Sequence, residues 1–296
     1  MKLTGNTILI TGAGSGIGLA LGEEFVKLDN RVIVAARSPE KLKLAKSKGL
    51  ETIKADLCEA GSIQTLSRKV TQEFPKTNVL IHNAALCKLE DLVQGGSPAV
   101  QEEMIATNLL GPMRLNDALL PHLLKQPSAT IIVLTSGLGF VPSAFYPTYS
   151  ATKAALHSYS QSLRFQLKDT SVRVIEVVPP YVQTQLGGAF QETDPNAMPL
   201  SDFISEAMQI LENNSQVEEV LVKRTLAHRF AAEAGREKYD AFFKQYNERL
   251  FNDLGRRGGR ASGNMKTLAE DQCRNGTAEG LILAGRISRP AKETKI

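Results

Sequence analysis

Short, continuously apolar segments alternate along this chain with longer stretches in which apolar residues recur every three or four positions. Continuous apolar runs are typical of strands covered on both faces, and they predict strands at residues 7–11, 31–36, 52–54, 78–82, 130–135, 172–178 and 219–222. The periodic stretches predict helices at residues 17–28, 39–48, 61–73, 98–125, 149–168 and 200–213. Strands that alternate with helices predict an α/β fold built on a doubly wound parallel sheet.

Polar and turn-forming residues fall at or just after the ends of several predicted strands. They are Gly12, Arg37, Asp56, Asn83, Ser136 and Pro179. In a doubly wound sheet, ligands bind beyond the carboxyl ends of the strands. We therefore expect these residues to meet in one crevice, although they are far apart in the sequence.

The first strand is followed at once by a glycine-rich turn, Thr11-Gly12-Ala13-Gly14-Ser15-Gly16-Ile17-Gly18, and then by an amphipathic helix. Glycines in this position allow a tight turn and a close approach of the backbone to a pyrophosphate, which sits at the helix N-terminus. The spacing is Gly-x-x-x-Gly-x-Gly. The alternative is a glycine-rich turn that binds nothing, but strand, turn and helix occur in the order that dinucleotide binding requires.

Tyr149 and Lys153 are four positions apart in a predicted helix, so they share one face. A neighbouring positive charge favours phenolate and lowers a tyrosine pKa. Such a tyrosine can exchange a proton with a carbonyl or alcohol oxygen near neutral pH. Taken alone, this spacing fits two residues on a solvated helix face equally well.

The glycine turn, Ser136, Tyr149 and Lys153 together resemble the short-chain dehydrogenase/reductase family, over about residues 4–225. Asn83-Ala84-Ala85 after a strand, Asn108 in a helix, and Pro179 followed by Thr184 add to the resemblance. It implies a Rossmann-like fold and oxidoreductase activity. Two positions depart from the family, which usually has glycine where this chain has Ala85 and Pro180.

The resemblance also implies a role for each catalytic residue. Tyr149 is the general acid in reduction and the general base in oxidation, while Lys153 lowers its pKa and holds the nicotinamide ribose. Ser136 hydrogen-bonds the substrate oxygen. Asn108 holds a water that links Lys153 to solvent, although a surface asparagine would give the same sequence.

The segment after the second strand favours NADP(H) over NAD(H). Ala36 stands where NAD enzymes usually have a carboxylate, and Arg37 and Ser38 suit a 2′-phosphate. The alternative is that Arg37 is a solvated loop charge. By resemblance Asp56 meets the adenine, with Leu57 beside it, although Asp56 could equally cap a helix. The remaining expected cofactor contacts are Gly12, Ser15, Gly16, Ile17, Gly18, Asn83, Ala84, Tyr149, Lys153, Pro179, Val182 and Thr184.

The expected substrate walls are the stretch 137–145, the residues after Asn83, and the loop 181–199. Their apolar character predicts a neutral or hydrophobic carbonyl compound or secondary alcohol. Gly187-Gly188 could hinge a substrate lid near residues 181–213.

Residues 198–247 resemble a bacterial subgroup named after lipoteichoic-acid D-alanylation gene clusters, which implies a helix, a final strand and a C-terminal helical extension. We expect residues 1–250 to form one domain and 251–296 to be a flexible basic tail. The tail holds nine Lys/Arg and five Asp/Glu, and its net charge of +4 equals that of the whole chain. No aromatic residues interleave with these charges, which disfavours nucleic-acid binding.

Composition narrows the remaining possibilities. Hydrophobic residues make up 42% of the 296 positions without a run long enough to span a membrane, and Met1 leads directly into the first strand, leaving no room for a signal peptide. Three dispersed cysteines favour a reducing cytoplasm, and the four histidines lack metal-ligand spacing, so we expect no metal.

These observations predict an NADP(H)-dependent oxidoreductase acting on a small carbonyl or alcohol. The alternative is an NADP-binding sensor or scaffold of the same fold without turnover. By resemblance we expect a homo-dimer or homo-tetramer assembled through the helices near 98–125 and 149–168.

Overall fold

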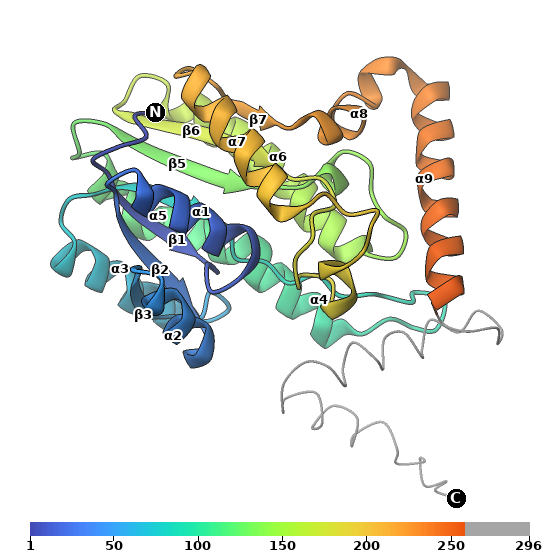
Figure 1. The fold of residues 1–296 in the computed structure, drawn as a ribbon, viewed down its shortest axis with the longest axis horizontal. Helices are drawn as coiled ribbons and strands as arrows, with labels where there is room; N and C mark the ends of the chain where they lie inside the picture. The colour runs from blue at the N-terminus through green and yellow to red at the C-terminus, as the bar shows by residue number, and fades with distance from the viewer. Residues whose placement is uncertain (258–296) are drawn as a thin grey trace, which may run out of the picture.

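The computed structural model describes residues 1–257, and their side chains as far as residue 252. Its centre is a parallel sheet of seven strands in the order β3-β2-β1-β4-β5-β6-β7 (Figure 1). The strands are β1 (Thr7–Thr11), β2 (Arg31–Ala36), β3 (Glu51–Lys54), β4 (Thr77–His82), β5 (Ala129–Leu134), β6 (Val172–Val178) and β7 (Glu219–Leu221). The predicted strands and the doubly wound fold are confirmed, with ends that differ by one residue or none.

Helices cover both faces of this sheet. They are α1 (Gly16–Lys27), α2 (Pro39–Ser47), α3 (Ala60–Glu73), α4 (Pro98–Ile105), α5 (Gly111–Leu123), α6 (Pro147–Leu167) and α7 (Leu200–Asn213). Alternate strand residues face opposite sides. Ile8 and Ile10 pack in the core beneath α1, α2 and α7, whereas Leu9 packs in the core beneath α3, α5 and α6. The strands are apolar throughout because both of their faces are buried.

The predicted helix over residues 98–125 is not a regular α-helix. A π-helical turn over Ala106–Leu110 separates α4 from α5. π-Turns often occur at functional sites, because the extra residue re-aims the side chains of that turn. Here the turn contains Asn108, which is fully buried. The apolar periodicity of the sequence did not reveal this interruption.

After β7 the chain forms short turns and two further helices, α8 (Leu226–Arg229) and α9 (Arg236–Arg257). Figure 1 shows α9 standing beyond the end of the sheet toward which β5 points. The helix continues past residue 250, where the sequence analysis placed the start of the tail. Residues 258–296, which include most of that predicted basic tail, lie outside the described part of the chain.

Within the described residues, no helix is both long and apolar enough to cross a membrane.

Candidate active site at the carboxyl ends of the strands

The glycine turn lies where β1 has β2 on one side and β4 on the other, which is the switch point of the sheet order. Gly12 has a φ of +68°, and a Cβ built on it would lie 2.5 Å from Ala84 Cα. A Cβ on Gly18 would lie 2.3 Å from Asn83 Nδ2. Both positions therefore require glycine, because the residues after β4 are in direct contact with the turn.

Thr11 and Asn83 hold the ends of β1 and β4 together. The backbone N–H groups of Asn83 and Ala84 donate to Thr11 Oγ1 at 3.1 and 3.2 Å, and Asn83 Nδ2 donates to Thr11 O at 2.9 Å. Asn83 thus holds the residue that precedes the glycine turn, and Ala84 lies beside Gly12. These contacts place both predicted residues directly against the glycine turn.

The N-terminus of α1 is open to an anion. Ser15 is its N-cap residue, yet among the described residues its side chain makes no capping hydrogen bond. Gly16 and Ile17 begin the helix, and a Cβ on Gly16 would lie 3.3 Å from Thr184 Cγ2. Uncapped backbone N–H groups and the helix dipole suit a pyrophosphate. The donor set and the glycines at positions 12, 14, 16 and 18 therefore fit a dinucleotide.

Arg37 and Ser38 lie at the carboxyl end of β2, as predicted. The Arg37 guanidinium contacts Glu103 at 3.2 Å and Asp56 at 3.7 Å, so in this structure carboxylates surround it. Ser38 caps α2, since its Oγ accepts a hydrogen bond from the Lys41 N–H at 3.2 Å.

Lys41 is a residue that the sequence analysis missed. A Cβ on Gly14 would lie 2.5 Å from Lys41 Cβ, so the first turn of α2 contacts the glycine turn. The glycine turn itself contains no basic residue and has Ser15 at its centre. The exposed Lys41 therefore adds a second basic residue, besides Arg37, near this turn. It lies 27 positions after Gly14, and a local motif cannot reveal a neighbour that the fold supplies.

Asp56 closes a turn before α3. Its Oδ1 accepts the N–H of Cys58 at 2.9 Å, while Glu59 is the N-cap residue of α3. Leu57 is buried and lies against Gly111, where a Cβ would be 3.0 Å from the Leu57 side chain. Both residues line the same edge of the sheet as Arg37.

Ser136, Tyr149 and Lys153 are buried together beyond β5. Lys153 Nζ lies 5.6 Å from the centre of the Tyr149 ring and donates to Leu134 O at 2.7 Å. A hydrogen bond also couples Ser136 to the Tyr149 phenol. Ser136 Oγ accepts the Leu138 N–H at 3.1 Å, which fixes the start of the loop that follows. The three predicted side chains therefore share one buried site.

Burial dominates the charge states in this site. It raises the pKa of Tyr149 above its usual value, and Cys87 adds to the rise while the Ser136 hydrogen bond acts against it. Burial also lowers the pKa of Lys153 from 10.5 to about 8, although Cys87 and Glu176 act to raise it. The sequence analysis expected a lowered Tyr149 pKa, whereas in this structure it is raised, because loss of hydration is the largest cause.

Asn108 binds two other parts of the site. Its Oδ1 accepts the Leu86 N–H at 2.7 Å, and its Nδ2 donates to Leu86 O at 2.8 Å and to Thr152 Oγ1 at 3.2 Å. The alternative of a surface asparagine is therefore wrong. Asn108 links the loop after β4 to the helix that carries Tyr149 and Lys153.

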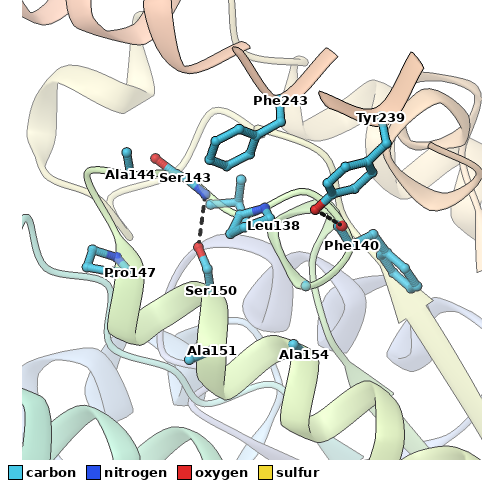
Figure 2. A pocket seen from close by; sticks show the side chains of 12 residues that line it. Leu138, Phe140, Ser143, Ala144, Pro147, Ser150, Ala151, Ala154, Tyr239 and Phe243 are labelled. Carbon is cyan, nitrogen blue, oxygen red and sulfur yellow. Dashed lines mark hydrogen bonds between the residues drawn. The ribbon is translucent and has the colours of Figure 1, made fainter. Parts of the chain in front are cut away.

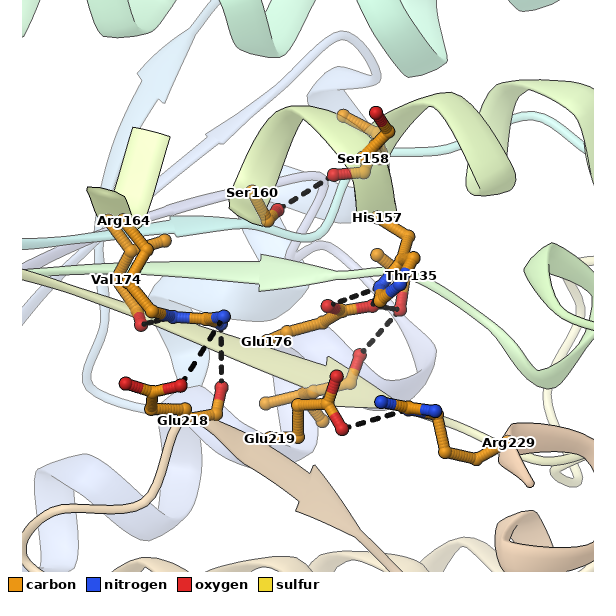
Figure 3. Close-up of polar contacts among 12 residues, drawn as sticks. Thr135, His157, Ser158, Ser160, Arg164, Val174, Glu176, Glu218, Glu219 and Arg229 are labelled. Carbon is orange, nitrogen blue, oxygen red and sulfur yellow. Dashed lines mark hydrogen bonds and ion pairs between the residues drawn. The ribbon is translucent and has the colours of Figure 1, made fainter. Parts of the chain in front are cut away.

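Two buried glutamates that the sequence analysis missed hold α6 in place. Glu90 accepts hydrogen bonds from Thr148 N at 2.9 Å and Thr148 Oγ1 at 2.8 Å, so it caps the helix start beside Tyr149. Glu176 of β6 accepts from Thr135 Oγ1 at 2.6 Å and lies 2.8 Å from His157 Nδ1 (Figure 3). His157 is one turn beyond Lys153, and Thr135 precedes Ser136.

His157 and Glu176 approach Glu219 closely enough that their ligand atoms all lie within 4.8 Å of one another. These groups already have protein partners, since Glu219 accepts from Arg229 Nε at 2.9 Å (Figure 3). The fold, and not sequence spacing, brings this histidine to the two carboxylates. Its contacts with Glu176 are hydrogen bonds that join α6 to β6.

The predicted cofactor residues after β6 lie in a folded loop. Pro179 O accepts the N–H of Gly137, which follows Ser136, at 3.0 Å. Gln191, which the sequence analysis did not single out, is buried and donates from Nε2 to Val182 O at 2.6 Å and Thr184 Oγ1 at 3.1 Å. These contacts hold Val182 and Thr184 opposite the glycine turn.

A model of the short chain dehydrogenase family matches residues 6–195. The chain belongs to the short-chain dehydrogenase family. It is 38% identical over 253 residues to the "Uncharacterized oxidoreductase DltE" of Bacillus subtilis, a match that covers 83% of this chain and 98% of that protein. The predicted family and the predicted subgroup resemblance are thereby confirmed.

Solved structures of the same fold carry nicotinamide cofactors. An alcohol dehydrogenase from Thermococcus sibiricus in complex with 5-hydroxy-NADP is 25% identical, with a TM-score of 0.65 over 73% of this chain and 95% of that one. A short-chain dehydrogenase from Sphingobium yanoikuyae in complex with NADPH is 26% identical, with a TM-score of 0.67 over 78% of this chain and 92% of that one.

Proposed function

We propose that this protein is an NADP(H)-dependent oxidoreductase that interconverts a neutral or hydrophobic carbonyl compound and its secondary alcohol. The observation that carries the proposal is the burial of Ser136, Tyr149 and Lys153 in one site beside an open helix N-terminus. Related structures that bind NADP and NADPH support the cofactor class. The same fold can bind a cofactor without turnover, and the complete catalytic set favours the enzyme over that sensor or scaffold.

When bound, the nicotinamide exchanges a hydride with the substrate carbon. In reduction, Tyr149 donates its phenol proton to the carbonyl oxygen as the carbon gains the hydride, so the C=O double bond becomes a CH–OH group. The upward shift of the Tyr149 pKa keeps this proton in place at neutral pH. Lys153, whose ammonium group lies beside the ring, stabilises the phenolate that forms.

Ser136 is the second residue that would hydrogen-bond the carbonyl oxygen of the substrate. Its oxygen accepts a hydrogen bond from Leu138 N, and its hydroxyl, which bonds the Tyr149 phenol in this structure, can donate to the substrate oxygen that binds beside that phenol. Lys153 Nζ uses one of its donors on Leu134 O. An ammonium group has three donors, so others remain for a ribose hydroxyl and a proton relay. Asn108 bonds Thr152 and so fixes α6, the helix that carries Tyr149 and Lys153.

Two basic side chains favour NADP(H). Arg37 follows β2 directly and Lys41 lies in the first turn of α2, while Ala36 stands where a carboxylate would repel a 2′-phosphate. Glu103 and Asp56 are the present partners of Arg37. A phosphate binds a guanidinium in a bidentate way and can take their place at this exposed position. Asp56 then becomes available to the adenine edge.

The first experiment follows NADPH oxidation with a panel of aldehydes, diketones and quinones, using wild type and Tyr149→Phe. We expect the variant to lose at least ~10²-fold in turnover, the effect typical of a general acid. NADPH binding should change little, because the ring is kept. Near-normal turnover by the variant would refute the proton donor, and binding without any turnover by wild type would favour the sensor.

The second experiment measures the Kd of NADPH and NADH for wild type, Arg37→Ala, Lys41→Ala and the double variant. Each loss of a phosphate-binding charge should weaken NADPH by about five- to fiftyfold, while NADH changes less than threefold. Lys43→Ala is the matched control, because Lys43 is also an exposed lysine of α2. Equal affinity of wild type for the two cofactors would contradict the NADP preference.

A further inference from the structure

The carboxylate of Glu176 is fully buried in β6. It accepts a hydrogen bond from Thr135 Oγ1 at 2.6 Å and lies 2.8 Å from His157 Nδ1 (Figure 3). Among the described side chains, no lysine or arginine forms an ion pair with it, since the nearby Arg229 binds Glu219 instead. Burying a carboxylate is costly without an opposite charge, so the position of Glu176 relative to other charged groups decides what it contributes.

Both partners of Glu176 lie next to the contacts of Lys153. Thr135 follows Leu134, whose carbonyl oxygen accepts the hydrogen bond from Lys153 Nζ at 2.7 Å. His157 is one helical turn after Lys153, so the two side chains share one face of α6. The carboxylate on β6 therefore ties the end of β5 to α6 at the place where the catalytic lysine is held.

The same cluster reaches the loop that precedes α6. The Phe140 ring meets the His157 ring edge to face with a centroid distance of 4.5 Å, and the Arg229 guanidinium carbon lies 5.1 Å from the centre of the Phe140 ring. Phe140 O also accepts a hydrogen bond from the hydroxyl of Tyr239 in α9 at 3.4 Å (Figure 2). The His157 ring is therefore held by this loop as well as by Glu176.

Lys153 and Glu176 also interact through their charges. Burial lowers the pKa of Lys153 to about 8, whereas Cys87 and Glu176 act to raise it. Burial raises the pKa of the Cys87 thiol to about 12, and it raises the pKa of Tyr149 above its usual value. Both groups are therefore uncharged near neutral pH, which leaves the Glu176 carboxylate as the negative group among these three neighbours.

We propose that Glu176 is a positioning residue for Lys153. Through Thr135 and His157 it holds the end of β5 and α6 together around this lysine, and it supplies a buried negative charge near the ammonium group. The inference rests on the proposed carbonyl reduction, in which Lys153 stabilises the phenolate of Tyr149. Both contributions keep the ammonium group charged and beside the phenol during proton transfer.

The charge of Glu176 is tested with Glu176→Gln, whose amide can still accept the hydrogen bond from Thr135. In the full chain labelled with ¹³C at lysine Cε, the Lys153 NMR signal is followed against pH and identified by its loss in Lys153→Met. We expect the titration midpoint of Lys153 to lie below that of wild type by about half a pH unit or more, because a nearby negative charge is lost. An unchanged or higher midpoint overturns the inference. This titration requires no substrate, so its result stands apart from the success or failure of the proposed reaction.

The tether is tested with Thr135→Val, which keeps the carboxylate and the shape of the side chain but removes the hydroxyl. With NADPH and the substrate that the screening panel identifies, kcat should fall about five- to tenfold, as for one lost hydrogen bond, while KM stays within about twofold. Glu176→Ala should lose at least as much, whereas Glu176→Gln should keep kcat within about threefold of wild type at about pH 6.5. A Thr135→Val enzyme with the wild-type kcat, or a loss in Glu176→Gln equal to that in Glu176→Ala, overturns the inference. Thr135→Val decides the matter if the alanine variant does not fold.

Two variants serve as controls for the Lys153 titration. Glu218→Gln is the matched control for the charge, because Glu218 is an exposed glutamate. Asn247→Ala removes a contact between α9 and the loop that precedes α6, in which Asn247 accepts the Ala144 N–H at 2.6 Å. Neither control should move the Lys153 midpoint by more than about 0.2, since an exposed charge is screened and the loop contact carries none. A shift in either control as large as that in Glu176→Gln overturns the inference.

Discussion

At the residue scale, a buried ammonium group is a costly feature of the site. Lys153 is 3% exposed, and burial lowers its pKa from 10.5 to about 8. The unfolded chain therefore binds its proton more tightly than the folded chain between pH 8 and 10.5. Below about pH 8 the full cost is present, and it diminishes as the pH rises through this range. We propose that this charge is retained for its role in the proposed reaction.

We therefore expect Lys153→Met to raise the free energy of unfolding at pH 7 by about 1–3 kcal/mol, since each pKa unit corresponds to ~1.4 kcal/mol. Activity should be lost at the same time. The difference between variant and wild type should shrink at pH 9.5, where folded wild type has largely lost the proton. Urea denaturation at both pH values measures it. A variant less stable than wild type at pH 7 would show that the bond to Leu134 O outweighs burial.

Other residues show why local motifs recover only part of the site. Tyr149 and Lys153 could be predicted because a helix puts positions four apart on one face. Lys41, Glu90 and Gln191 could not, since each reaches its partner through the tertiary fold. The predicted direction of the Tyr149 pKa was wrong for a related reason. Sequence shows which charges are near in the chain, whereas burial depends on the whole structure.

At the element scale, one buried glutamine holds the loop after β6 together. Gln191 holds Val182 and Thr184 through Nε2 and accepts the Gly187 N–H at 2.8 Å through Oε1. We propose that this loop begins the substrate lid predicted near residues 181–213 and that the Gln191 side chain keeps the cofactor-facing part of the lid in order. Gln191→Ala should remove three hydrogen bonds, increase proteolytic cleavage within 185–197, and lower kcat about tenfold or more.

Gln185→Ala is the matched control for this prediction, because Gln185 is an exposed glutamine of the same loop. It should leave cleavage and kcat within twofold of wild type. Limited proteolysis with mass mapping, with and without NADP⁺, reports the order of the loop. If both variants are cleaved at the same rate as wild type, Gln191 does not hold the lid.

Elements with a simple pattern were predicted well. The strands are short apolar runs, and a sheet buried on both faces demands such runs. The interruption at Ala106–Leu110 was not predicted, because a π-turn shifts the apolar period too briefly to show against its neighbours. Helix α9 was anticipated only as an extension by resemblance. Its contacts with the loop at Ala144 depend on packing between distant segments, which no periodicity records.

At the scale of the whole molecule, the face formed by α4, α5 and α6 carries exposed large apolar side chains. Ile105, Leu124 and Phe165 are 40%, 43% and 70% exposed. We propose that a second copy of the chain covers this face through a two-fold interface, in which each helix meets its counterpart. A like patch on both partners is self-complementary, so one substitution acts twice in the dimer.

We expect light scattering of the full chain to give at least two monomer masses, and Phe165→Asp to shift the protein toward one mass. The introduced carboxylates would face each other or apolar surface in the dimer, which is costly in either case. Leu44→Asp is the control, because Leu44 is 46% exposed on α2, away from this face. A chain ended after Arg257 should keep the wild-type number of subunits. A monomeric wild type would refute the assembly, whereas a monomer that dimerises only after this truncation would assign the C-terminal residues a regulatory role.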